Sequence, residues 1–155
     1  MANKNTINIS IVEDNNLFRI ALKSDIETTF SNQQLAIRSY ATGEDCMSTL
    51  KDFKPNIVIL DYNLDSNNTS AANCTKILDA IKRIDSEISV VMLTSQDNIE
   101  IALQSFKHGA SDYVVKTETK FRKINYALQN QFKIIEANKN AARYKYLVAG
   151  MGLCV

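Results

Sequence analysis

The stretch VVMLTSQ, residues 90–96, joins an apolar run rich in β-branched residues to two hydroxyl side chains. Such a run is typical of a strand that is buried on both faces, as in a parallel sheet covered by helices. The run stops abruptly at Thr94 and Ser95. The sequence therefore raises the question of what a hydroxyl at this strand end contacts.

Four other short apolar segments predict strands, and a segment long enough for one helix follows each strand. The five strand segments are INISIV (7–12), LAIRSY (35–40), NIVILDY (56–62), SVVMLT (89–94) and DYVVK (112–116). Strict alternation of this kind implies parallel strands joined by right-handed crossovers, with helices on both faces of the sheet. The sequence thus predicts an open α/β three-layer sandwich, which binds ligands beyond the carboxyl ends of its strands.

Apolar residues recur at helical spacing in the intervening segments. In the predicted fourth helix, the apolar stripe contains Ile99, Ala102, Leu103 and Phe106. His108, the only histidine, lies on the opposite face and is expected to be exposed to solvent.

The last predicted helix runs from about residue 119 to about residue 144. Its stripe contains Phe121, Ile124, Leu128, Phe132 and Ile135.

Length and composition indicate one globular domain. The chain has 155 residues, of which 45% are hydrophobic, and a single proline. The N-terminal residues lack the pattern of a secretory signal, and no apolar window is long enough to span a bilayer, so we expect a cytoplasmic protein. The three cysteines, Cys46, Cys74 and Cys154, are far apart, which argues against disulfides and a zinc site.

The net charge of +1 hides an asymmetry along the chain. Residues 1–118 hold 11 Lys or Arg against 16 Asp or Glu, whereas residues 119–155 hold 7 against 1. A basic tail of this kind can bind nucleic acid, an anionic membrane surface or an acidic partner, although a solvated helix face is the commonest explanation.

Reactive side chains stand at four of the five predicted strand ends. Glu13 and Asp14 follow the first strand, Asp61 ends the third, Thr94 ends the fourth and Lys116 ends the fifth. Three carboxylates at one edge repel one another unless a cation neutralises them. Oxygen ligands favour Mg²⁺, and the lack of a Cys or His cluster disfavours softer metals.

A carboxylate beside Mg²⁺, a hydroxyl and a lysine is suited to receive a phosphoryl group. Asp61, at the end of the central strand, is the candidate nucleophile. The metal, the ammonium and the hydroxyl would share the charge on the transferring oxygens.

Four ordered motifs resemble the receiver domain of two-component response regulators. They are IVEDN (11–15), IVILDYNL (57–64), VVMLTS (90–95) and GASDYVVK (109–116). The resemblance covers about residues 5–132 and implies the CheY-like, flavodoxin-like doubly wound (βα)5 fold, with strand order 2-1-3-4-5. Residues 133–155 would then form a basic helical extension and an apolar C-terminal tail.

The resemblance also implies a role for each matching residue. Asp61 would accept a phosphoryl group from a histidine kinase or a phosphotransfer protein. Asp14, Asp61 and the backbone carbonyl of Asn63 would ligate Mg²⁺ directly, and Glu13 would act through a bound water.

The remaining matches concern the phosphorylated state. Lys116 would pair with a phosphoryl oxygen, and Thr94 would hydrogen-bond another. The space that Thr94 vacates would admit the ring of Tyr113. The fourth helix, the fifth strand and the fifth helix would form the output surface.

The sequence departs from the family pattern in two places. The loop after Asp61 lacks the usual proline, carries Asp65 in its place and is about five residues longer. Thr117 replaces the proline that normally follows Lys116 through a cis bond. Either the site holds a strained cis bond there, or the bond is trans, which would allow Lys116 to be displaced. Ser95 is expected to cap the fourth helix, and Gln96 and Asn63 are candidates for tuning hydrolysis of the phosphoryl group.

Several alternatives remain open from the sequence. A receiver-like interaction scaffold that is not phosphorylated is the main one. A phosphatase of the haloacid dehalogenase type needs Asp-x-Asp after the first strand, and VEDNN does not supply it. A flavodoxin is disfavoured because Glu13 and Asp14 would repel its FMN phosphate.

The C-terminal residues do not show how the domain would pass its signal on. They are too few for a DNA-binding domain, so we expect output through protein contacts. The apolar run 146–155 packs back on the domain, forms a homodimer contact, or is the stump of a longer protein.

Overall fold

The computed structural model describes residues 5–64 and 70–152, in which strands and helices alternate without exception. The elements are β1 (Ile7–Val12), α1 (Asn16–Thr29), β2 (Leu35–Tyr40), α2 (Gly43–Phe53), β3 (Ile57–Asp61), α3 (Ser70–Ile84), β4 (Ser89–Thr94), α4 (Ile99–Lys107), β5 (Asp112–Val115) and α5 (Lys120–Gly152). The strands are parallel and form one sheet of order β2-β1-β3-β4-β5. The predicted flavodoxin-like fold and strand order are confirmed.

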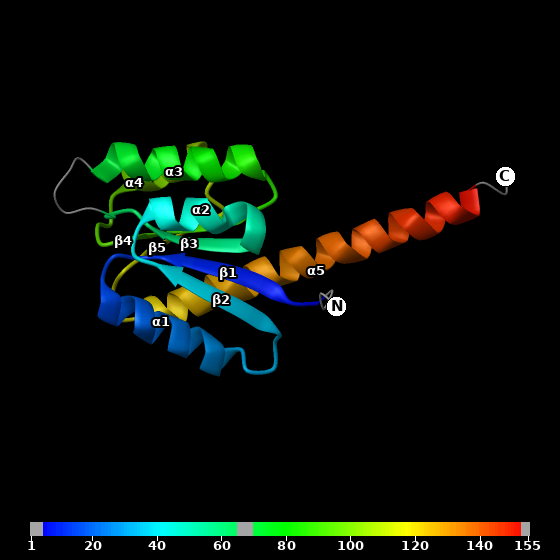
Figure 1. The fold of residues 1–155 in the computed structure, drawn as a ribbon, viewed down its shortest axis with the longest axis horizontal. Coiled ribbons are helices and arrows are strands. Elements are labelled where there is room, and N and C mark those ends of the chain that lie inside the picture. The colour runs from blue at the N-terminus through cyan, green and yellow to red at the C-terminus, as the bar shows by residue number, and fades with distance from the viewer. Residues whose placement is uncertain (1–4, 65–69, 153–155) are drawn as a thin grey trace.

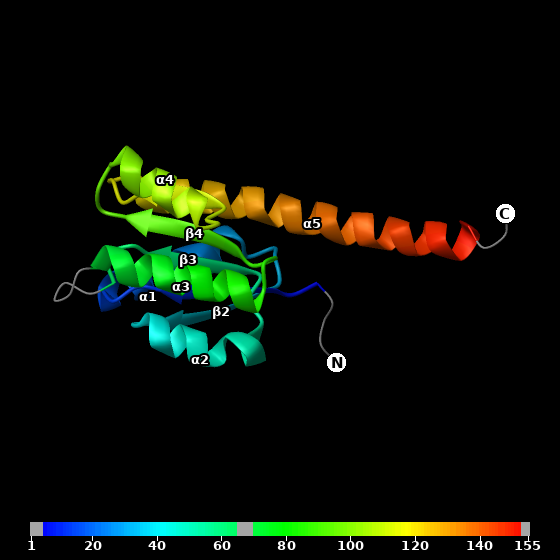
Figure 2. The same cartoon turned by 90° about the horizontal axis from the view of Figure 1, so that it is seen from above.

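Helices cover both faces of the sheet (Figure 1). Helices α1 and α5 lie on one face, and α2, α3 and α4 lie on the other (Figures 1 and 2). Strand β3 is buried along its whole length: Ile57 and Ile59 belong to the core on the α1 and α5 side, while Val58 and Leu60 belong to the core on the α2 and α3 side. This double burial explains why β3 and β4 are almost entirely apolar until they reach the site.

The strand register brings the polar strand ends to one edge of the sheet. Val12 is aligned with Leu60, Asp61 with Leu93, and Thr94 with Val115. The strands therefore end at nearly the same level, so the residues that follow them lie side by side at one edge of the sheet.

Helix α4 packs on the domain through its polar face, although the amphipathic pattern favours packing through the apolar stripe. Ile99 and Phe106 are 74% and 48% exposed, and Leu103 is exposed as well, whereas Ser105 is 1% exposed. The Ser105 hydroxyl donates to the Ile101 carbonyl at 2.8 Å, so this small polar side chain is satisfied within the helix and can be buried. Ile99, Leu103 and Phe106 of the apolar stripe are therefore exposed to solvent.

Two expectations near α4 were wrong. His108 is not fully exposed, because its Nδ1 lies 2.7 Å from a carboxylate oxygen of Asp79 on α3. The N-cap of α4 is Asn98, whose side chain accepts from the Glu100 N–H at 2.9 Å, and not Ser95. The chain needs residues 95–98 to leave the sheet before the helix begins.

Helix α5 extends well beyond the body of the domain. Its first half packs on the sheet through Ile124, Leu128 and Phe132. The helix then continues to Gly152, and residues 140–151 are all exposed. Figures 1 and 2 show this second half projecting from the sandwich, so residues 146–151 do not pack back on the domain. None of the helices in the described residues is both long and apolar enough to span a membrane.

Candidate functional site

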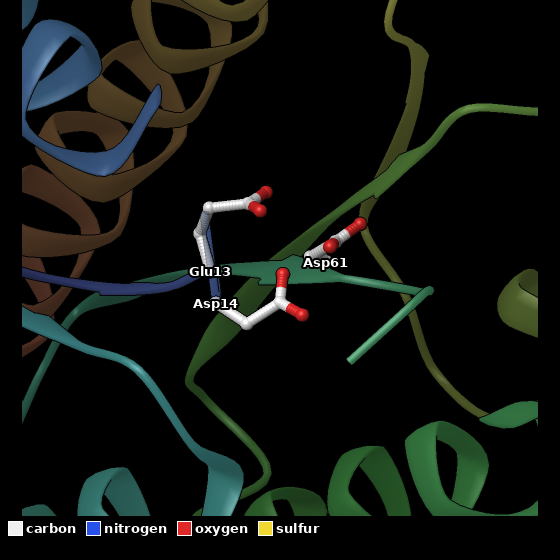
Figure 3. Close-up of side chains that lie close together, drawn as sticks. All are labelled: Glu13, Asp14 and Asp61. Carbon is white, nitrogen blue, oxygen red and sulfur yellow. The ribbon is translucent and has the colours of Figure 1, made fainter. Parts of the chain in front are cut away.

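Three carboxylates meet at the edge of the sheet that the register defines. Glu13 and Asp14 come from the loop after β1, and Asp61 ends β3 (Figure 3). One carboxylate oxygen from each residue lies within 4.8 Å of the other two. Glu13 and Asp61 are each 1% exposed, while Asp14 is exposed. The predicted convergence of these three side chains is what the structure shows.

Lys116 reaches the carboxylates from the end of β5. Its Nζ lies 2.6 Å from Glu13 Oε2 and 3.1 Å from Asp61 Oδ1. The Lys116–Thr117 bond is trans, like every peptide bond in the part of the chain described. The Lys116 backbone N–H donates to the Thr94 carbonyl at 2.7 Å. This extension of the β-ladder holds the lysine against the carboxylates, so the trans bond does not displace it from the site.

The shared ammonium leaves the buried carboxylates incompletely neutralised. Burial raises the pKa of the Glu13 carboxyl from 4.5 to about 7, although the hydrogen bond from Lys116 opposes the rise and the negative charge of Asp61 adds to it. Burial by itself would lower the pKa of Lys116, but the hydrogen bond to Glu13 and the charge of Asp61 outweigh it and raise that pKa. A further cation is therefore favoured at this site.

Local backbone contacts fix Glu13. The Asn15 N–H donates to Glu13 Oε1 at 3.1 Å, and the Arg19 guanidinium donates to the Glu13 carbonyl at 2.6 Å. Asn15 also caps α1 by accepting from the Phe18 N–H. Sequence reasoning missed Asn15 and Arg19, yet an Asn directly before a helical pattern is a recognisable cap signal.

Aromatic and basic residues of α1 and α5 complete the pocket. The Phe18 ring centroid is 4.9 Å from Lys116 Nζ, a cation–π contact. The pocket is lined by Glu13, Asp14, Asn15, Phe18, Asp61, Asn63, Ser95, Lys116 and Lys120. Sequence reasoning also missed Phe18 and Lys120, because their approach depends on how α1 and α5 pack together.

Thr94 and Tyr113 both bond to the backbone of Gln96. Thr94 is fully buried, and its Oγ1 accepts from the Gln96 N–H at 3.2 Å. The Tyr113 hydroxyl donates to the Gln96 carbonyl at 3.0 Å. A movement of this loop would therefore alter both side chains.

Asn63 links the acceptor strand to the same loop. Its backbone N–H donates to Asp61 Oδ1 at 3.3 Å, and its side-chain amide donates to the Ser95 hydroxyl. Ser95 was expected to cap α4, but its hydroxyl accepts from Asn63 instead. Asp65 and the rest of the proposed insertion up to residue 69 lie outside the described residues.

The donor set fits a hard divalent cation. Three carboxylates offer oxygen ligands in reach of one another, one of them accessible from solvent. Such a set matches the preference of Mg²⁺ for carboxylates and retained waters.

Comparison with known proteins assigns this fold and site to a family. Residues 9–128 match the model of the response regulator receiver domain. The chain therefore belongs to this family, the CheY-like receiver domains of two-component signalling.

Its curated relatives are longer proteins. The transcriptional regulatory protein AfsQ1 of Streptomyces coelicolor is 28% identical over 107 residues, which are 68% of this chain and 43% of that protein. The nitrogen assimilation regulatory protein NtrX of Azorhizobium caulinodans is 32% identical over 79 residues, which are 51% of this chain and 17% of that protein. The chain thus spans less than half the length of either relative.

Solved structures share the fold. The signal receiver domain of a putative LuxO repressor protein from Vibrio parahaemolyticus has a TM-score of 0.73 at 20% identity, covering 88% of this chain and 97% of that one. A CheY-like receiver domain protein from Methanospirillum hungatei has a TM-score of 0.70 at 19% identity, covering 86% and 98%.

Proposed function

We propose that Asp61 accepts a phosphoryl group from the phosphohistidine of a sensor kinase or phosphotransfer protein. The observation that carries the proposal is the position of Lys116, whose Nζ lies 3.1 Å from Asp61 Oδ1 beside two further carboxylates. An Asp61 oxygen would attack phosphorus, forming an acyl phosphate, as the bond to the histidine nitrogen breaks and that nitrogen keeps the electron pair. The proposal includes the cytoplasmic location expected from the sequence.

Mg²⁺ would be held by Asp14, Asp61 and the carbonyl of Asn63, with Glu13 acting through a water. When bound, the ion would neutralise the carboxylates and offset negative charge on the transferring oxygens. Lys116 would move from its present contact with Glu13 toward the phosphoryl group. Its raised pKa keeps the ammonium charged for this role.

The phosphoryl group would act on the surface through Thr94. The Thr94 hydroxyl would donate to a phosphoryl oxygen. Moving toward that oxygen would take the Thr94 Oγ1 away from the Gln96 N–H that now donates to it, and loss of that hydrogen bond would free the loop to which Tyr113 is bonded. The exposed stripe of α4, with β5 and α5, would then be the output surface for a downstream protein.

Phosphorylation by a small-molecule donor tests the proposal. Incubating the chain with Mg²⁺ and acetyl phosphate should add one phosphoryl mass, which Asp61→Asn should abolish. Asp52→Asn, at an exposed position of α2, is the matched control and should retain the added mass. An unmodified wild-type chain would instead favour the interaction scaffold that cannot be phosphorylated.

A further inference from the structure

The projecting half of α5 carries apolar side chains that no described part of the chain covers. Tyr144 and Met151 are 70% and 72% exposed, and Ile134 and Val148 are about half exposed. Figures 1 and 2 show the segment clear of the sandwich. Exposed apolar side chains in this number indicate an interaction surface.

These side chains follow a heptad repeat. Along α5, apolar residues recur with alternating spacings of three and four, at Ile134, Ala137, Ala141, Tyr144, Val148 and Met151. We call this set the α5 stripe. Such spacing keeps the residues in one narrow band and is typical of a helix that packs against another helix.

The α5 stripe points away from the body of the domain. At 3.6 residues per turn it lies roughly 140° around the helix from the face that packs on the sheet through Ile124 and Leu128. A second helix could therefore lie along it without displacing the sandwich.

We propose that two copies of this chain associate through the α5 stripe as a parallel two-stranded coiled coil. Ile134 and Val148 would occupy a positions, where β-branched residues favour two parallel strands. Ala141 at the a position between them would let the two helices approach closely. This inference does not depend on phosphorylation of Asp61.

The flanking charges are compatible with this pairing. In a parallel coiled coil, each g position faces the next e position of the other helix. Lys133 of one copy would face Asn138 of the other, and Asn140 would face Lys145. No like charges meet, even though the segment is basic.

Two tyrosines provide a matched test of the stripe. Tyr144 lies on it, whereas Tyr146 is 85% exposed on the opposite side of the helix. In size-exclusion chromatography with light scattering at high micromolar concentration, the full chain and Tyr146→Glu should both have twice the mass of the 17.4 kDa chain. Tyr144→Glu should have the mass of one chain. A monomeric wild type, a higher oligomer, or equal effects of the two substitutions would overturn the proposal.

Cross-linking tests the parallel orientation. Cys46 and Cys74 are buried, so a Cys154→Ser background leaves no other native thiol to compete. Mild oxidation of Ile134→Cys in this background should give disulfide-linked dimers, and Tyr146→Cys should not. In an antiparallel pair the two residues 134 would lie about 25 Å apart, so failure of Ile134→Cys to cross-link would overturn the parallel arrangement.

An anionic membrane surface is the alternative partner, because basic amphipathic helices also bind such surfaces. Co-sedimentation with phosphatidylserine vesicles distinguishes it. Binding by a monomeric chain that Tyr144→Glu abolishes would overturn the dimer and assign the α5 stripe to lipid. The Asp61→Asn chain should behave like wild type in all these assays, which separates their outcome from that of the phosphorylation test.

Discussion

At the scale of single residues, the site holds two buried carboxylates and one shared ammonium. Glu13 and Asp61 are as buried as the core, and Lys116 bonds to both. Burial, together with the negative charge of Asp61, raises the pKa of Glu13 even though the hydrogen bond from Lys116 lowers it. The electrostatics therefore connect cation binding to proton release.

Mg²⁺ should compete with a proton at Glu13. Because the pKa of this carboxyl is about 7 in the chain without metal, Glu13 is largely protonated below that pH and ionised above it. Mg²⁺ affinity should accordingly weaken as the pH falls from about 8 to about 6, and binding near neutral pH should release protons. Calorimetric titration in buffers of different ionisation enthalpy measures the number released. Glu13→Gln should remove the release, and an unchanged release would contradict this role for Glu13.

Thr94→Ala should separate phosphoryl transfer from the response to it. The variant keeps Asp61, Lys116 and the acidic cluster, so acetyl phosphate should still add one phosphoryl mass. It loses the hydroxyl that bonds to Gln96, so hydrogen exchange near Tyr113 should no longer change on phosphorylation. Ser95→Ala, which removes the neighbouring hydroxyl, should retain the change. A normal response in Thr94→Ala would show that the signal leaves the site by another route.

At the scale of helices and strands, α4 shows that the spacing of apolar residues does not always predict which face of a helix is buried. Its pattern identifies which residues are apolar, but the sheet covers the face that contains Ser105 and leaves Leu103 in solvent. A short helix near the edge of a sheet can satisfy a small hydroxyl internally and expose apolar residues that serve a partner. Burial in such an element depends on its neighbours more than on its own sequence.

Substitutions on the two faces of α4 should therefore have different effects on the free energy of unfolding. Leu103→Ser should change the free energy of unfolding by no more than about 0.5 kcal/mol, as expected for an exposed position. Ser105→Leu should destabilise the fold by about 1–3 kcal/mol, because extra atoms must enter a filled space. Urea denaturation measures both values. The reverse order would mean that the apolar stripe faces the sheet after all.

At the scale of the whole molecule, the chain combines a compact sandwich with a long projecting helix (Figure 1). The acidic cluster lies at the carboxyl ends of the strands, and the α5 stripe begins where α5 leaves the body. The site and the proposed contact between copies thus occupy separate parts of the molecule and can be disabled separately.

Removal of residues 140–155 should leave the sandwich and its phosphorylation intact. Residues 140–151 are exposed, so their loss removes little packing from the core. The shortened chain should keep its labelling by acetyl phosphate and unfold at a temperature that does not vary with protein concentration. The full chain should unfold at a higher temperature as its concentration rises, because association stabilises the folded state. Thermal unfolding at several concentrations measures this, and a loss of cooperative unfolding on truncation would contradict the independence of the sandwich.

Local sequence patterns are sufficient to predict the strands, their order along the chain and the residues at their ends. The predicted bounds of β1, β2 and β4 agree with the structure, and the convergence of Glu13, Asp61 and Lys116 followed from parallel strands ending at one edge. These features depend on residue types within one element and on the strong constraint that βαβ connections place on topology.

The contacts between elements could be learned only from the folded structure. It determined the buried face of α4, the cap at Asn98 and the contact of Lys116 with the carboxylates through a trans bond. It also showed that α5 leaves the body and carries its apolar stripe into solvent. Such features depend on contacts between residues far apart in the chain, which local patterns do not encode.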